Sequence, residues 1–124
     1  MSKKPSSVHY NEYLDLDKIL DAQHPLSKGN NNEAHEEMLF IIIHQTYELW
    51  FKQIIHEINS VIHLLSKEKM DEENVGIVVG RFDRVSKILD VLVQQLDILE
   101  TMTALDFLDF RNYLSPASGF QSHQ

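Results

Sequence analysis

One histidine interrupts a run of apolar and aromatic residues, and its type and position favour chemistry. The run covers residues 40–50 and reads Phe-Ile-Ile-Ile-His-Gln-Thr-Tyr-Glu-Leu-Trp, with His44 near its centre. A buried polar group needs a hydrogen-bond partner. Two interpretations follow: a core histidine bonded to a neighbouring backbone carbonyl, or a neutral imidazole that accepts a hydrogen bond from a ligand or acts as a base. Taken by itself, such a residue is more often a core histidine.

Arg111 is the second candidate. A short helix carrying Phe107, Phe110, Arg111 and Leu114 would project its guanidinium from an apolar side. Such an arginine can hold a carboxylate through two parallel hydrogen bonds. The alternative is an arginine that lies along the surface and pairs with a nearby acid.

The seven histidines do not form a recognisable metal-binding pattern. Helical di-iron sites use Glu-x-x-His pairs, which this sequence lacks, so we assign no metal ligand. We expect His35, His56 and His63 to be exposed or half-buried. The absence of cysteine excludes disulfides, thiolate metal sites and a cysteine nucleophile, and it suits a reducing cytoplasm.

Composition indicates one ordinary globular domain. The chain has 124 residues, of which 43% are hydrophobic and 24% charged, and a net charge of −8. That charge argues against a nucleic-acid or anionic-membrane surface as the main partner. The longest apolar run, residues 38–43, is far shorter than a membrane span, and no signal peptide is visible. We therefore expect a cytoplasmic protein.

Two heptad stripes predict the elements that position these residues. No proline or glycine occurs from residue 33 to 67, and we predict one long helix there. A charged break over residues 67–74 separates it from a second helical pattern, so the two should form an antiparallel hairpin. The stripes are Phe40, His44, Tyr47, Phe51, Ile54, Ile58, Val61 and Leu65, and then Val75, Val78, Phe82, Val85, Leu89, Leu92, Leu96 and Leu99.

Shorter signals complete an all-α prediction: a long antiparallel helical hairpin plus short helices. Residues 10–20 suggest a short amphipathic segment, and residues 24–32 a polar loop. Thr103 and Asp106 resemble a capping box that begins a short helix, which the pair Ser115-Pro116 should end. We expect residues 1–7 to be a disordered tail and residues 8–124 to be a single helical domain.

Together these stretches resemble the tryptophan 2,3-dioxygenase family, and the matches keep the family's order over nearly all of the chain. The matching segments are Tyr10-x-x-Tyr13-Leu14-x-Leu16-Asp17, Ala22-Gln23-His24-Pro25-Leu26-Ser27, Glu37-Met38-Leu39-Phe40-Ile41-Ile42-x-His44-Gln45-Thr46-x-Glu48-Leu49-Trp50, Leu99-Glu100-Thr101-Met102-Thr103, and Phe110-Arg111-x-x-Leu114-x-Pro116-x-Ser118-Gly119-Phe120-Gln121-Ser122.

The resemblance implies a helical haem dioxygenase that opens the indole ring of L-tryptophan with O2 to give N-formyl-L-kynurenine, in tryptophan catabolism. His44 would lie on the distal side of haem b and bond the indole N–H, and Arg111 would bind the substrate carboxylate. Phe40 would pack against both indole and haem. The remaining implied contacts are Ile41, Ile42, Ile43, Phe107, Leu114 and Ser118 with substrate, Ser118 and Gly119 with the cofactor, and Tyr10, Tyr13 and Leu14 with a neighbouring subunit's site in a family tetramer.

Two departures follow from the resemblance. Some family members have tyrosine where Phe107 stands, and the missing hydroxyl bond would weaken substrate binding by about 1 kcal/mol. The family chain also continues well beyond Gln124, and that part carries the axial haem histidine. We therefore expect an N-terminal portion that is inactive alone, whether a truncated product, one half of a split gene or a partial sequence. A non-catalytic helical module for oligomerisation or indole-acid binding, and a marginally folded remnant, are the alternatives.

Overall fold

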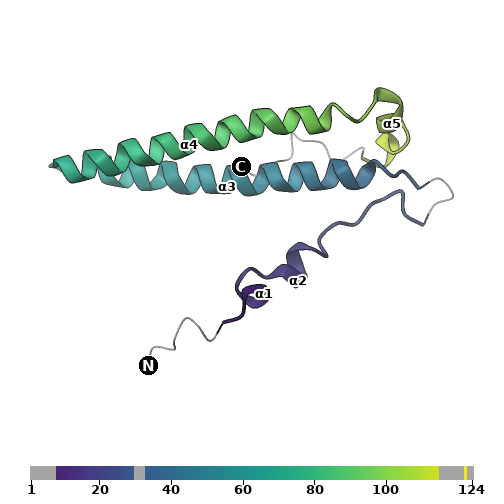
Figure 1. Cartoon of the computed structure of the whole chain (residues 1–124), viewed down its shortest axis with the longest axis horizontal. Coiled ribbons are helices and arrows are strands. Elements are labelled where there is room, and N and C mark those ends of the chain that lie inside the picture. Colours follow the sequence, from purple (N-terminus) through teal and green to yellow (C-terminus); the bar gives the residue numbers. More distant parts are fainter. Residues whose placement is uncertain (1–7, 30–32, 115–121, 123–124) are drawn as a thin grey trace.

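The computed structural model describes residues 8–29, 33–114 and 122, and its described part is all-α without strands, as predicted. Two long helices lie side by side along the molecule, with short helices before them and after them in the chain (Figure 1). The predicted tail over residues 1–7 lies outside the described residues. In chain order the elements are α1 (Tyr10–Tyr13), α2 (Leu16–Ile19), α3 (Glu37–Leu65), α4 (Glu72–Leu99), α5 (Ala104–Leu108) and the 3-10 helix η2 (Arg111–Leu114).

The predicted hairpin is confirmed, with shifted ends. α3 begins at Glu37 rather than near residue 33, because residues 35 and 36 form a turn closed by the Glu37 N–H, which donates to the Ala34 carbonyl at 3.2 Å. α4 begins at Glu72, three residues earlier than its apolar pattern. The Asp71 carboxylate accepts the Asn74 N–H at 2.8 Å, and such a cap offsets the unpaired donors of a first helical turn.

The two predicted stripes coincide only in part with the buried positions of the hairpin. On α4, Val78 and Leu92 are buried, but Phe82 and Leu89 from the same stripe stay about half exposed, and the buried Ile88 lies outside it. Three polar contacts also join the two helices. They are Thr46 Oγ1 donating to Gln95 Oε1, Tyr47 Oη donating to the Leu92 carbonyl (both 2.8 Å), and Arg84 donating to the buried Glu57 carboxylate at 3.1 Å.

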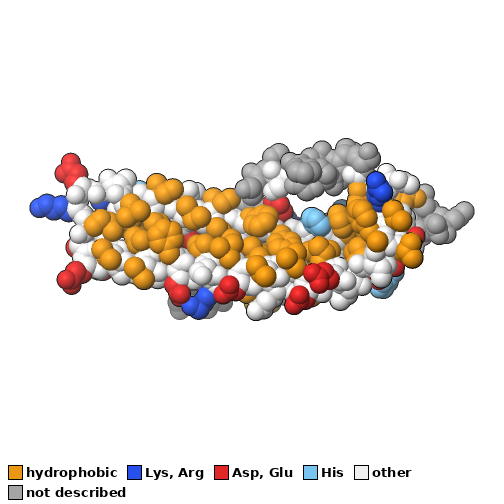
Figure 2. All heavy atoms as spheres, turned by 90° about the horizontal axis from the view of Figure 1, so that it is seen from above, with side chains coloured by type: hydrophobic (Ala, Val, Ile, Leu, Met, Phe, Trp, Pro, Cys, Tyr) orange, Lys and Arg blue, Asp and Glu red, His pale blue; other side chains and the backbone are white. Residues whose placement is uncertain are grey.

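Much apolar surface therefore remains uncovered on the hairpin. Figure 2 shows hydrophobic side chains gathered along the length of one face of the molecule. In the part of the chain that the structure describes, no helix is long and apolar enough to cross a membrane. On α4, the apolar side chains that are about half exposed or more include Phe82, Leu89, Val79 and Val93.

The predicted helix after α4 is two elements rather than one. The capping box is confirmed, since Thr103 Oγ1 accepts the Asp106 N–H at 3.1 Å and the Asp106 carboxylate accepts the Thr103 N–H at 2.9 Å. The hydrogen bond from the Thr103 backbone lowers the pKa of Asp106. The α-helix ends at Leu108, and the chain continues as η2 from Arg111, so Phe107 and Arg111 do not share one helical face.

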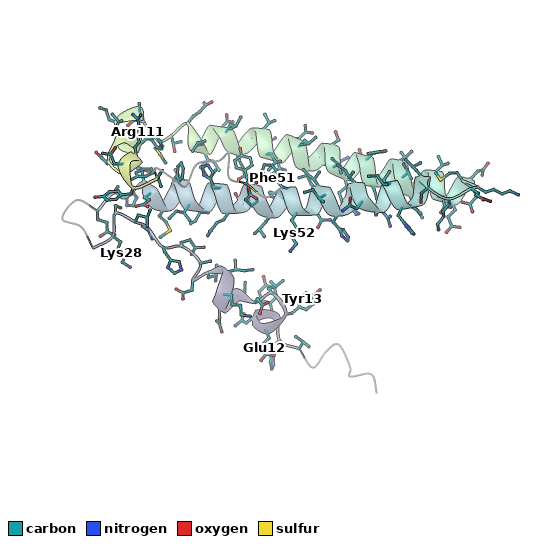
Figure 3. The ribbon with its side chains drawn as sticks, turned by 180° about the vertical axis from the view of Figure 1, so that it is seen from behind. Glu12, Tyr13, Lys28, Phe51, Lys52 and Arg111 are labelled. Carbon is teal, nitrogen blue, oxygen red and sulfur yellow. The ribbon has the colours of Figure 1, made fainter. Side chains whose placement is uncertain are left out.

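The N-terminal segment forms an arm beside α3 and contacts it through the residues from Ile19 to Gln23. Ile19 at the end of α2 lines a hollow together with residues of α3, and Figure 3 shows Glu12 and Tyr13 at the far end of this arm. Asp15 joins the two short helices in the left-handed region at φ 53°. Tyr10 and Tyr13 are 71% and 77% exposed, so the arm leaves its tyrosines to solvent.

Candidate functional site

The imidazole of His44 is fixed by a hydrogen bond within α3. Its Nδ1 lies 2.7 Å from the carbonyl oxygen of Phe40, one turn earlier. A carbonyl oxygen only accepts, so in the neutral ring Nδ1 carries the proton and Nε2 keeps its lone pair. No hydrogen bond to Nε2 occurs within residues 8–29, 33–114 and 122. The backbone partner agrees with the core interpretation, and the free lone pair on Nε2 leaves the ligand-binding interpretation as a prediction.

An aromatic cluster meets that ring through Phe40 and joins the start of α3 to the segment after α4. The centroids of Phe40 and His44 lie 4.2 Å apart, with a tilt of 33° between the rings. Phe110 packs edge-on against Phe40 at 5.5 Å and against Phe107 at 5.4 Å, while Phe40 and Phe107 are 6.0 Å apart. Edge-on packing suits the quadrupoles of aromatic rings. The cluster thus brings α5 and η2 back onto the first turns of α3.

Beside His44 an apolar hollow of about 650 Å³ opens between α3 and α4. Figure 3 shows Phe51 between the two helices and Lys52 pointing away from α4. A volume of this size is ordinary for a pocket that takes a flat organic ligand. Its lining is formed by His44, Tyr47, Glu48, Phe51, Leu89, Leu92, Val93, Leu96 and Ser122.

Two polar side chains near this region, Ser122 and Arg111, differ in their surroundings. Ser122 Oγ donates to the Glu48 carboxylate at 2.7 Å, so residues 74 apart in the sequence meet one turn after His44. Arg111 is exposed at the α5 end of the hairpin, and it forms no ion pair with any residue that the structure describes.

A protein-family model described as tryptophan 2,3-dioxygenase matches residues 1–124, which is the whole of this sequence. The chain belongs to the tryptophan 2,3-dioxygenase family. Proteins of that name from Bdellovibrio bacteriovorus, Aedes aegypti and Dictyostelium discoideum are 55%, 56% and 56% identical to it. The matched regions cover 94%, 93% and 94% of this chain, but 33%, 29% and 29% of those relatives. The chain thus spans about a third of the length of these tryptophan 2,3-dioxygenases.

The predicted site residues of this family member are only partly brought together. Phe40, His44 and Phe107 belong to one cluster, and Leu114 ends the adjoining η2. Tyr10, Tyr13 and Leu14 lie on the arm, away from that cluster. Ser118 and Gly119, the expected distal and cofactor contacts, lie outside the described residues.

The three isoleucines before His44 point in different directions, as consecutive helical residues must. Ile43 is buried in the core, whereas Ile42 is 42% exposed and lines a separate hollow with Pro25 and His35. Ile41 is half-buried. Their assignment to the substrate pocket stays a prediction, and the geometry gives each of them a different surrounding.

Three residues at or near the site were not among the predicted site residues. Phe110 is completely buried and links Phe40 to Phe107, which its spacing of three residues from Phe107 indicated only in part. Tyr47 is locked by its bond to the Leu92 carbonyl. Gln45 binds the arm, donating to the Ala22 carbonyl and accepting from Gln23, both at 2.9 Å. No motif in the sequence predicts these partners, because each pair is joined by tertiary contact.

The predicted exposure of the other histidines is confirmed for His35, His56 and His63. No group of three His, Asp or Glu side chains suited to a metal ion occurs within the described ranges. The donor chemistry of the described site is one imidazole with an apolar wall. That set fits one face of a flat apolar cofactor and gives us no residue to assign as an iron ligand.

Proposed function

We propose that this chain supplies the substrate-facing side of a haem-dependent tryptophan 2,3-dioxygenase site, and that further protein completes the site. The observation that carries the proposal is the 2.7 Å contact between His44 Nδ1 and the Phe40 carbonyl oxygen. Because Nδ1 donates to the Phe40 carbonyl, Nε2 is an acceptor, and the indole N–H of tryptophan is a donor. An ionised or oppositely protonated ring would repel that N–H.

In this proposal each described residue has a physical task. His44 would accept the indole N–H, and Phe40 and the apolar hollow beside His44 would hold the indole plane and exclude water. Arg111 would bind the carboxylate of the amino acid with paired, charge-assisted hydrogen bonds. Fixing both ends of the substrate orients its C2–C3 bond, and orientation alone can supply several kcal/mol of a reaction barrier.

The cofactor of the proposed reaction is haem b, whose ferrous iron would supply the activation of O2 for its insertion across the indole C2–C3 bond. Phe40 and His44 would contact the haem on this side, with Ser118 and Gly119 as further predicted contacts. The product would be N-formyl-L-kynurenine, and the reaction would be the first step of tryptophan catabolism by the kynurenine pathway. We propose a homo-oligomer or a complementary C-terminal chain as the partner, in the cytoplasm.

Reconstitution tests this function. The chain would be mixed with a second chain that comprises the portion of the Bdellovibrio relative outside the matched region, and ferrous haem and L-tryptophan would be added. We expect a Soret band and formylkynurenine from the mixture and from neither chain alone. The control is the relative's own N-terminal portion with the same second chain. An active control beside a hybrid with no Soret band and no product would overturn the proposal.

A second candidate, a non-catalytic module that binds an indole acid, is favoured by the extent of exposed apolar surface on α4. Calorimetry of the chain with L-tryptophan in the absence of haem separates the two. Binding without haem supports the module. Binding that requires both haem and the second chain supports the dioxygenase site.

A further inference from the structure

Glu37 is a buried acid in an unexpected place. It is the first residue of α3 and only 1% exposed, whereas acids at this position of a helix normally face solvent. Its carboxylate binds two backbone groups of the preceding loop. Oε2 accepts from the Leu26 N–H at 2.7 Å, and Oε1 accepts from the Ser27 N–H at 2.9 Å.

The same loop is closed a second time through Ser27. This residue is fully buried, and its Oγ accepts the Ala34 N–H at 3.0 Å. Glu37 and Ser27 therefore satisfy three backbone donors of a loop that has no regular structure of its own, which meets the requirement that buried backbone groups be paired. Both oxygens of Glu37 are used, so a neutral amide could replace only one of the two bonds.

The loop also connects the N-terminal arm to α3. Eight residues after Glu37, and thus roughly 12 Å along the helix, Gln45 donates to the Ala22 carbonyl and accepts from Gln23. Two side chains of α3 thereby hold the segment between Ala22 and Ser27. A hollow of about 410 Å³ lies against this segment, lined by Ile19 and Ala22 of the arm side and by His44 and Gln45 of α3.

We propose that Glu37 is a positioning residue, whose carboxylate sets the path by which the arm (residues 8–23) leaves α3 and so the arm-side wall next to His44. It does not touch the substrate; it acts through Leu26, Ser27 and the arm. The inference deepens the proposed function and rests on it, because it gives the arm a fixed direction toward its own or a neighbouring site. Its physical readouts need neither haem nor tryptophan, so they fail or succeed independently of that function.

The test is Glu37→Gln in the full chain, with Glu36→Gln as the matched control on the adjacent residue. Hydrogen exchange should show at least a tenfold loss of protection at the Leu26 and Ser27 amides in Glu37→Gln, with protection in the middle of α3 unchanged. Trypsin cleavage at Lys18 and Lys28 should accelerate by a similar factor. Glu36→Gln should leave both readouts as in the wild type.

Ser27→Ala provides a second variant if Glu37→Gln folds poorly. It should speed cleavage at Lys28 by a smaller factor, because the Glu37 bonds to the loop remain. In the reconstituted enzyme, Glu37→Gln should raise the KM for tryptophan about tenfold with a smaller change in kcat. Unchanged protection of Leu26 and Ser27 in Glu37→Gln, or an equal loss along all of α3, would overturn the positioning role.

Discussion

The Nδ1 atom of His44 lies 2.7 Å from the carbonyl oxygen of Phe40, one helical turn earlier, and the centroids of the two tilted rings are 4.2 Å apart. One short contact therefore fixes the orientation of the imidazole and leaves Nε2 with its lone pair. The imidazole of His44 packs against the ring of Phe40, which in turn packs against Phe110. A group held in this way needs little reorganisation when a donor binds.

His44→Ala should lower kcat/KM for tryptophan in the reconstituted enzyme by about 10- to 100-fold, the loss expected for one buried hydrogen bond. The diagnostic comparison uses 1-methyltryptophan, which lacks the indole N–H. Wild-type enzyme should discriminate strongly between the two substrates, and His44→Ala should discriminate little. Equal discrimination in both enzymes would contradict the acceptor role of His44.

Arg111→Ala should raise the KM for tryptophan about 10- to 100-fold, since it removes a charge-assisted contact with the carboxylate. Binding of tryptamine, which has no carboxylate, is the control and should change little. Steady-state kinetics with tryptophan and inhibition by tryptamine measure the two effects. A variant that binds tryptophan as tightly as the wild type would remove Arg111 from the site.

Tyr47→Phe should lower the free energy of unfolding by about 1 kcal/mol, because the hydroxyl donates at 2.8 Å to the Leu92 carbonyl across the hairpin. Tyr113→Phe, on the exposed side of η2, is the matched control and should leave stability within about 0.5 kcal/mol. Urea unfolding followed by circular dichroism measures both. Equal losses in the two variants would show that the Tyr47 bond does not stabilise the seam.

The free energy of unfolding should fall in acid because the Glu57 carboxylate becomes protonated. Burial raises the pKa of its carboxyl, but hydrogen bonds from Arg84 and Gln53 and the charge of Arg84 outweigh burial and hold the pKa below the ordinary 4.5. The unfolded chain then binds the proton more readily, so this contribution is present above pH 4.5 and is lost as the pH falls through the folded value.

The measurement is the urea midpoint of wild type and Glu57→Gln from pH 7 to pH 3. Glu57→Gln should be less stable near neutrality, and the difference should shrink in acid, where the wild-type carboxylate becomes protonated. Glu68→Gln, an exposed position in the connection between α3 and α4, serves as the control. A difference between wild type and Glu57→Gln that stays constant over this range would exclude the carboxylate as its source.

Two glycines should respond to alanine in opposite directions. Gly29 has φ of 91°, so Gly29→Ala should cost about 1 kcal/mol through a strained backbone. Gly80 lies within α4, where an added Cβ would meet no atom within 4 Å, so Gly80→Ala should stabilise by about 0.5–1 kcal/mol. Thermal unfolding of the two variants tests the pair, and shifts of the same sign would contradict it.

The sequence by itself determined the all-α class, the hairpin, the capping box at Thr103 and the family. These follow from local pattern: helical periodicity, the placement of proline and glycine, and a motif order that the family model matches throughout. His44 was also identified in this way, because a titratable ring in an apolar helical run is conspicuous. Its roles toward substrate and haem, like that of Arg111, came from the resemblance and remain proposals.

The tertiary structure decided which atoms meet. The heptad stripes did not by themselves determine which positions are buried, because both helices are apolar over more than one face: Val78 and Leu92 are buried, whereas Leu89 of the same stripe is about half exposed. Contacts between segments distant in the chain likewise determine the break between Leu108 and Arg111 and the burial of Phe110. The same holds for the hydrogen bonds that the Leu26 and Ser27 N–H groups donate to Glu37. Local periodicity carries no information on such pairings, since they exist only once the chain has folded back on itself.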